Sequence, residues 1–153
     1  MQEAFLLFWK AKTIRQFTYH RKEKLKKRSD IDLLFKEGRT FGAFPFRVYY
    51  RLLPVAAATS NEIMLQAGVS VSKKHFKRAV HRNRIKRLMR EGYRLQKEGL
   101  ILALRTQGCI MHLFIIYTGK ELPVFEDVKN KLKTILQRLE KEIATPWKDW
   151  PIY

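Results

Sequence analysis

The sequence predicts a single small domain of the α+β class, an α/β sandwich in which a mixed sheet of about four strands packs with helices. The chain has 153 residues, of which 46% are hydrophobic and 12% aromatic, which suffices for one buried core. Short β-rich apolar runs alternate with segments of helical period. A single cysteine excludes a disulfide-linked scaffold.

The first 19 residues are expected to form a weakly ordered extension. Their apolar run "AFLLFW" is too short to span a bilayer and lacks the flanks of a secretory signal. A surface-lying amphipathic segment is the alternative. We therefore expect a cytoplasmic protein without a membrane partner. The folded domain is expected to cover residues 20–142, and residues 143–153 to form a C-terminal tail.

A short N-terminal helix is predicted over residues 30–37. Ser29 would cap it, Asp32 stands in capping-box spacing, and Gly38 would end it. The preceding basic block, residues 21–28, either contacts a polyanion or is a flexible solvated arm.

Strands are predicted from three apolar runs. "FPFRVYYRLLP" (44–54) is bounded by prolines, and "EIMLQAGVSVS" (62–72) is broken at Gly68 by a bulge or into two short strands. Residues 109–117 form a nearly continuous apolar run that buries the Cys109 thiol. Pro123 then opens a C-terminal helix with apolar residues at helical spacing: Val124, Val128, Leu132, Ile135, Leu136 and Leu139.

A long basic helix is predicted within "KKHFKRAVHRNRIKRLMREGYR" (73–94). This stretch holds ten Lys and Arg against one acid, so it carries +9 (ten minus one) of the chain's +18. On a helical wheel Ile85, Leu88, Met89, Gly92 and Gln96 form a narrow apolar stripe. The far side is cationic and suits a polyanion, and its arginines favour phosphate. The cationic side of the wheel comprises Asn83, Lys86, Arg87, Arg90, Arg94 and Lys97.

The run "RNRIKRLMRE" (82–91), preceded by "GVSVSKKHFKRAVH", resembles the signature of the bacterial ribonuclease P protein component family. The upstream "KLKKRSDIDLLFKEGRTF" resembles that family's opening, and the match runs from about residue 20 to 142. The resemblance implies a small α/β accessory subunit of an RNA enzyme. The RNA, holding most of the magnesium, would hydrolyse precursor tRNA to remove its 5′ leader, so the implied partners are the catalytic RNA and precursor tRNA.

The resemblance also implies two binding surfaces. One faces the catalytic RNA and comprises Lys73, Lys74, Arg78, Arg82, Asn83, Arg84, Lys86, Arg87 and Arg90. The other is a cleft for the single-stranded leader, lined by Ile31, Phe35 and Tyr49. Ile31 departs from the family, which commonly has an aromatic residue there. An aliphatic side chain can pack against a base but does not stack on it. Phe35 has ordinary core packing as an equal alternative.

No protein-borne active site is expected. Asp30 and Asp32 are explained by helix capping, and the four histidines show neither zinc spacing nor a carboxylate partner pattern. Another structured-RNA-binding, ribosome-associated or DNA-binding protein would share the basic helix without the full signature. A membrane-surface or calmodulin-target helix would not explain Asn83 among arginines. No protein partner is evident.

Overall fold

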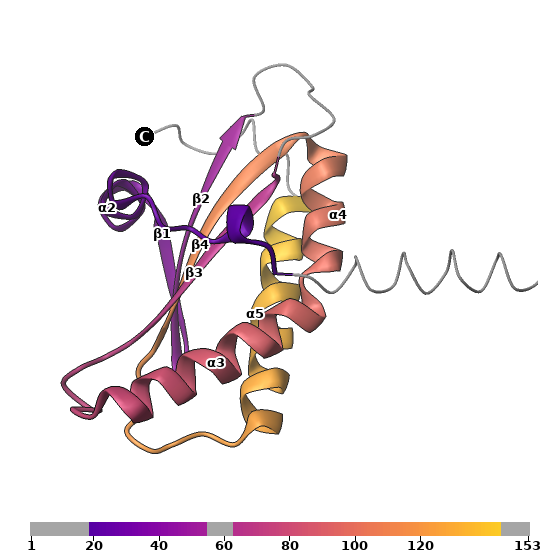
Figure 1. Ribbon diagram of the computed structural model, residues 1–153. Coiled ribbons are helices and arrows are strands. Elements are labelled where there is room, and N and C mark those ends of the chain that lie inside the picture. Colours follow the sequence, from indigo (N-terminus) through magenta and orange to yellow (C-terminus); the bar gives the residue numbers. More distant parts are fainter. Residues whose placement is uncertain (1–18, 55–62, 145–153) are drawn as a thin grey trace, which may run out of the picture.

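In the computed structural model, which describes residues 19–54 and 63–144, a twisted sheet lies between one helix and a layer of three others (Figure 1). The elements, in chain order, are η1 (Arg21–Glu23), α2 (Arg28–Glu37), β1 (Arg39–Ala43), β2 (Phe46–Pro54), β3 (Leu65–Val71), α3 (Ala79–Gln96), α4 (Glu98–Gln107), β4 (Cys109–Tyr117) and α5 (Phe125–Ala144).

The sheet has the strand order β1-β2-β4-β3. β1 and β2 form an antiparallel hairpin, β2 pairs with β4 antiparallel, and β3 pairs with β4 parallel. Since parallel neighbours need a crossover, the chain leaves β3 through α3 and α4 before it returns along β4. The predicted α+β class with a mixed four-stranded sheet is confirmed.

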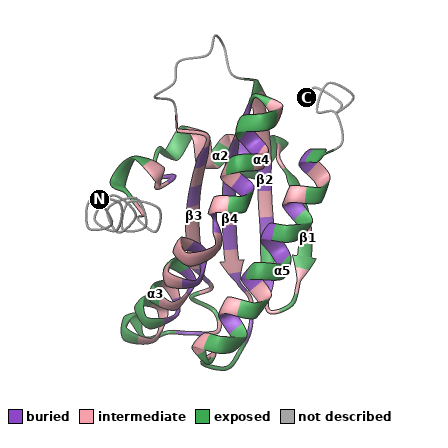
Figure 2. Ribbon diagram, turned by 90° about the vertical axis from the view of Figure 1, so that its right-hand side faces the viewer, coloured by how far each residue is buried: buried purple, intermediate pink, exposed green. Residues whose placement is uncertain are grey.

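The core lies between the sheet and the layer of α3, α4 and α5. Every second residue of β2, namely Phe46, Val48 and Tyr50, faces these helices and is buried, as are Leu113 and Ile115 on β4. Figure 2 shows buried positions on the central strands and on the helices. α2 contacts β2 and β4 from the opposite face of the sheet (Figure 1). The two faces therefore differ: one fills the core, and the other is covered only in part.

Besides the short η1, the sequence prediction lacks two elements. β1 is a five-residue strand, and α4 occupies "EGLILALRTQ", where no helix was expected. α4 buries Leu100 and Leu104 and ends at Gly108, whose φ of 65° is left-handed. The expected break at Gly68 is wrong, because β3 runs without interruption through it.

The predicted helix starts need correction. α2 begins at Arg28 with Lys27 as its N-cap, so Ser29 lies inside the helix and does not cap it. Asp32 pairs with Arg28 at 4.0 Å in place of the expected capping box. Gly38 does end the helix, with extended backbone. α5 begins two residues after Pro123, which leaves Val124 exposed, whereas the other five predicted apolar positions are buried: Val128, Leu132, Ile135, Leu136 and Leu139.

Lys97 is also corrected. The wheel assigned it to the cationic face, but α3 ends at Gln96, and Lys97 is buried, with its Nζ 2.6 Å from Glu23 Oε1. The same N-terminal segment touches β3, where the Ala67 carbonyl accepts the Leu25 N–H and the Tyr19 hydroxyl. Residues 19–25 are thus part of the folded domain.

The expectations for residues 1–18 and for the tail from residue 145 concern parts of the chain outside the described residues. α5 itself continues to Ala144. Within residues 19–54 and 63–144, no helix is long and apolar enough to cross a membrane.

Candidate nucleic-acid-binding surfaces

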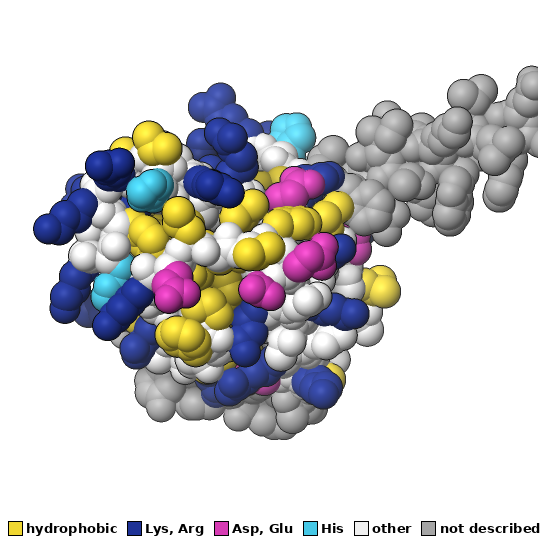
Figure 3. Space-filling model, turned by 90° about the horizontal axis from the view of Figure 1, so that it is seen from below, with side chains coloured by type: hydrophobic (Ala, Val, Ile, Leu, Met, Phe, Trp, Pro, Cys, Tyr) yellow, Lys and Arg dark blue, Asp and Glu magenta, His cyan; other side chains and the backbone are white. Residues whose placement is uncertain are grey.

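α3 and the loop before it present a cationic surface. Asn83, Arg87 and Arg90 follow one another at spacings of three or four residues, so they share a helix face, and all three are exposed. Viewed from below, Lys and Arg side chains ring the molecule, while acids are few and lie nearer the middle (Figure 3). The term α3 surface is used below for nine residues: Lys73, Lys74, Arg78, Arg82, Asn83, Arg84, Lys86, Arg87 and Arg90. Arg82 and Lys86 are half-buried, and the others are exposed.

The opposite side of α3 fixes the helix in the core. Ile85, Met89 and Tyr93 are buried, and Gly92 lets α5 come close. A Cβ at Gly92 would lie 2.9 Å from Cδ1 of Leu132. Tyr93 was not part of the predicted stripe, although it follows Met89 at helical spacing. This apolar packing stabilises α3 against the repulsion between its like charges.

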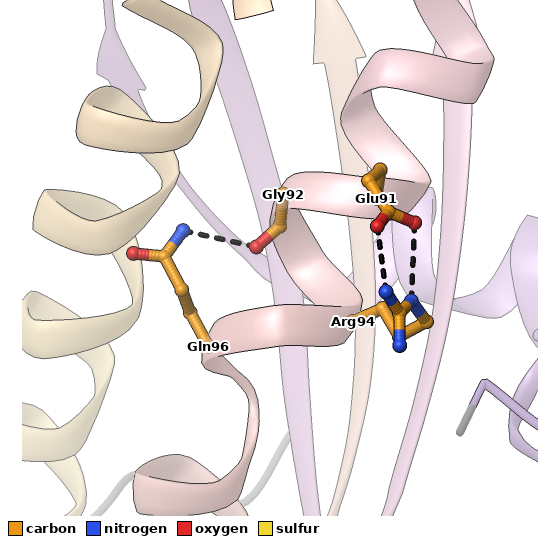
Figure 4. Close-up of polar contacts among 4 residues, drawn as sticks. All are labelled: Glu91, Gly92, Arg94 and Gln96. Atoms are coloured by element: carbon orange, nitrogen blue, oxygen red, sulfur yellow. Dashed lines mark hydrogen bonds and ion pairs between the residues drawn. The ribbon is translucent and has the colours of Figure 1, made fainter. Parts of the chain in front are cut away.

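The single acid of the basic segment is neutralised within α3. Glu91 accepts two hydrogen bonds from the Arg94 guanidinium, of 3.0 and 2.6 Å, and this interaction lowers the pKa of the carboxyl (Figure 4). Nearby, the Gln96 amide donates to the carbonyls of Gly92 and Lys129, both at 2.9 Å, and so links the end of α3 to α5. Arg94 therefore offsets Glu91, and the cationic character of the α3 surface is retained.

Arg82 organises the loop that leads into α3. Its Nη1 donates to the carbonyls of Phe76 and Lys77, both at 2.8 Å. Phe76 is buried and its ring lies 6.0 Å from that of Tyr117, so the loop is fixed to the core at this point. Arg82 thus helps to hold the loop that carries Lys73, Lys74 and Arg78.

A second candidate surface lies between α2 and the sheet face that points away from the core. Phe35 of α2 is 40% exposed, and its ring centroid lies 4.7 Å from that of Tyr49 on β2 and 5.2 Å from that of Phe114 on β4. Phe35 is therefore not an ordinary core residue. We call Phe35, Tyr49 and Phe114 the aromatic platform. Ile31, one turn earlier on α2, is half-buried.

Phe114 was not predicted as a site residue. Its strand reads as a continuous apolar run, in which nothing distinguishes the core face from the α2 face. The register Tyr49↔Phe114 brings together residues from different strands, and a single sequence does not reveal that pairing.

Polar and charged groups flank the aromatic platform along β2. The Arg47 guanidinium lies 5.8 Å from the Tyr49 ring centroid, and Arg51 pairs with Glu37 at 3.7 Å. His112 is the register partner of Arg51 and is buried, which lowers the pKa of its imidazole below the usual 6.5. This face thus combines aromatic rings with cations, the groups that bind bases and phosphates.

Within residues 19–54 and 63–144, no group of three or more His, Cys, Asp or Glu is placed to hold a metal ion. Cys109 is buried, as predicted, and this burial raises the pKa of its thiol. The described arrangement offers non-covalent binding of a polyanion.

Comparison with known proteins gives a consistent result. The family model described as Ribonuclease P matches residues 19–140. The ribonuclease P protein component of Porphyromonas gingivalis is 37% identical over 129 residues, 84% of this chain and 91% of the relative. That of Chlorobium phaeobacteroides is 30% identical over 124 residues, 76% of this chain and 84% of the relative.

Solved structures agree on the fold. The RNase P protein from Thermotoga maritima aligns with a TM-score of 0.58 and 27% identity over 75% of this chain and 96% of that chain. The Staphylococcus aureus RNase P protein aligns with a TM-score of 0.57 over 76% of this chain and 94% of that chain, at 24% identity, a likeness that concerns the fold alone.

Proposed function

Because the chain belongs to the bacterial ribonuclease P protein component family, we propose how it takes part in tRNA processing. It is the protein component of a ribonucleoprotein endonuclease. In our proposal, the α3 surface binds the catalytic RNA, and the site between α2 and the sheet binds the 5′ leader of precursor tRNA. The RNA performs the cleavage and holds most of the magnesium, and the complex acts in the cytoplasm.

The observation that carries the proposal is the α3 surface itself. Its arginines are presented on a helix whose other side is fixed in the core, so the backbone positions that carry them are set before RNA arrives. Guanidinium groups bind phosphate bidentately, which a lysine does not do. A rigid array of this kind suits a folded RNA with phosphates at fixed spacing.

The aromatic platform supports the leader assignment. Sequence-tolerant binding of single-stranded RNA relies on aromatic side chains on which bases stack, combined with nearby positive charge. Phe35 and Tyr49 supply rings, and Arg47 lies beside Tyr49. Ile31 contributes apolar contact only.

The contribution of the protein to cleavage is electrostatic. Cations placed near RNA phosphates reduce the repulsion between the catalytic RNA and its substrate. The same positive field lowers the magnesium concentration that the RNA needs, because fewer divalent ions are required to neutralise phosphates. We therefore expect the greatest stimulation at low magnesium.

The first experiment measures cleavage of a precursor tRNA at low magnesium with the protein alone, the cognate catalytic RNA alone, and both. The double variant Arg87→Ala/Arg90→Ala is compared with Lys133→Ala/Lys141→Ala, which removes the same charge from exposed positions on α5. Arg82 is not used, because its substitution would also disturb the loop before α3.

We expect cleavage only where RNA is present, and stimulation by the wild-type protein and by the α5 variant. The α3 variant should bind the RNA more weakly, and the slope of log affinity against log salt should fall by about two for the two lost phosphate contacts. Equal binding and cleavage by both variants would mean that the α3 surface is not the RNA interface. Cleavage by the protein alone would contradict an RNA-based activity.

A further inference from the structure

We propose that Phe114, on the central strand β4, is a leader-binding residue that supplies the aromatic surface which Ile31 of α2 does not. The proposal rests on the leader site suggested above and deepens it. The aromatic partner of Phe35 would then come from the sheet and not from α2.

The ring contacts define the platform. Phe35 meets both Tyr49 and Phe114 edge to face, with interplanar angles of 72° and 69°. It is therefore wedged between two rings that belong to neighbouring strands. Tyr49 and Phe114 are direct register partners on β2 and β4, so the sheet fixes the distance between their backbones. The Phe35 ring of α2 contacts both of their rings.

Gly68 makes room for Phe114. A Cβ at Gly68 would lie 2.7 Å from both Cδ2 and Cε2 of Phe114, closer than real Cβ atoms approach another atom. Gly68 is the register partner of Phe114 on β3, so the Phe114 ring lies against the bare backbone of that strand. This contact gives a physical reason for a glycine inside an uninterrupted strand.

Phe114 is not required to fill the core. Its neighbours Leu113 and Ile115 point toward α3–α5 and are fully buried, whereas Phe114 lies on the α2 face and is only half-buried. On that face Ile31 is also half-buried, and it offers a base no aromatic surface. A ring at position 114 supplies stacking surface that single-stranded RNA needs.

The test uses the assembled ribonucleoprotein and compares its affinity for precursor tRNA with its affinity for the same tRNA without a leader. Phe114→Leu keeps an apolar side chain but removes the ring. We expect the affinity gained from the leader to fall about tenfold, within the range known for loss of one base-stacking ring. Affinity for the leaderless tRNA should not change.

Two further variants separate stacking from structure. Adding Ile31→Phe to Phe114→Leu should recover most of the lost leader affinity, because a ring returns to the platform from α2. Gly68→Ala, which leaves every aromatic side chain in the sequence, should reproduce the loss by displacing the Phe114 ring. It also tests the proposal if Phe114→Leu does not fold.

Each outcome is decisive. If Tyr49→Ala lowers leader affinity but Phe114→Leu does not, the leader site stands and the role of Phe114 is refuted. If neither variant changes leader affinity, the leader site itself is misplaced. Equal weakening of leader-bearing and leaderless substrates, or no recovery with Ile31→Phe, would make Phe114 a structural residue only.

Discussion

Lys97 attaches the N-terminal segment to the body of the domain. Its side chain is 2% exposed, with Nζ 2.6 Å from Glu23 Oε1 and 5.7 Å from the Tyr19 ring centroid. Around this pair, Tyr93 is fully buried, and burial raises the pKa of the Tyr19 hydroxyl to about 12. An ammonium group in such surroundings is tolerated because a carboxylate lies beside it.

Lys97→Met should therefore destabilise the protein through the partner that it leaves behind. The Glu23 carboxylate would stay largely buried without its cation, and we expect the free energy of unfolding in urea to fall by about 3 kcal/mol. The double variant Glu23→Gln/Lys97→Met removes both charges, so its free energy of unfolding should fall clearly less than that of Lys97→Met. A double variant less stable than the single one would show that the pair itself, and not an isolated charge, sets the energy.

The glycines of α3 and α4 differ in the groups that surround them. In α3, Gly92 faces α5, where a Cβ would lie 2.9 Å from Cδ1 of the buried Leu132 and 3.6 Å from Cα of Lys129. In α4, a Cβ at Gly99 would meet the carboxylate of Glu140, the mobile end of a long side chain. The first contact fixes the separation of two helices, and the second can be relieved by a rotamer change.

Gly92→Ala and Gly99→Ala should consequently have opposite effects on stability. In a helix interior alanine is favoured over glycine by about 1 kcal/mol, which applies fully to Gly92 and less to Gly99 in the first turn of α4. Overpacking in a core costs about 1–3 kcal/mol. We expect the midpoint of thermal unfolding to fall for Gly92→Ala and to stay level or rise for Gly99→Ala. A rise for both would indicate that Leu132 moves aside easily and that α3 and α5 are not closely packed.

The elements differ in how far the sequence predicts them, for physical reasons. α3 and α5 have long amphipathic periods, so their existence and faces were predicted. α4 lacks a clear polar side in "LILAL", and such a short apolar run suits a buried strand as well as a helix. β1 contains Gly42 and has mostly exposed side chains, so it shows no apolar alternation.

The same distinction applies to the candidate sites. Local spacing predicts a cationic face on α3, and Asn83, Arg87 and Arg90 are exposed there. The extension of this surface to Lys73, Lys74 and Arg78, which precede the helix, is implied only by the family resemblance. Phe114 becomes visible only through the pairing of β2 with β4, and Lys97 only through a contact with Glu23, 74 positions earlier in the chain. Local patterns contain neither kind of information.

At the scale of the whole molecule, the net charge of +18 is the dominant property. Like charges repel over the whole surface and destabilise the compact state, while they speed association with a polyanion. Apart from the buried pair of Lys97 with Glu23, pairs that offset some of this charge are partly exposed, as in Arg94 with Glu91 and Arg51 with Glu37. Such pairs each contribute little to stability.

Stability of the isolated protein should therefore increase with salt. Raising sodium chloride from about 0.01 M to about 0.1 M shortens the Debye length from about 30 Å to about 10 Å and screens the repulsion. We expect the thermal unfolding midpoint to rise over this range, and to rise less for Arg87→Ala/Arg90→Ala, which has less repulsion to screen. A midpoint that falls with salt would mean that attractive pairs outweigh the repulsion.

The hydrogen bonds that the Ala67 carbonyl accepts from Leu25 and Tyr19 affect more than the stability of the N-terminal segment. β3 is an outer strand of the sheet, and an uncovered outer strand is a template on which other chains can add strands. Residues 19–25 shield part of that edge. A chain cut just after Leu25 would keep every strand and all the helices from α2 to α5. It would lose the Glu23 carboxylate beside the buried Lys97 and would expose β3, so self-association through β3 would accompany a loss of stability.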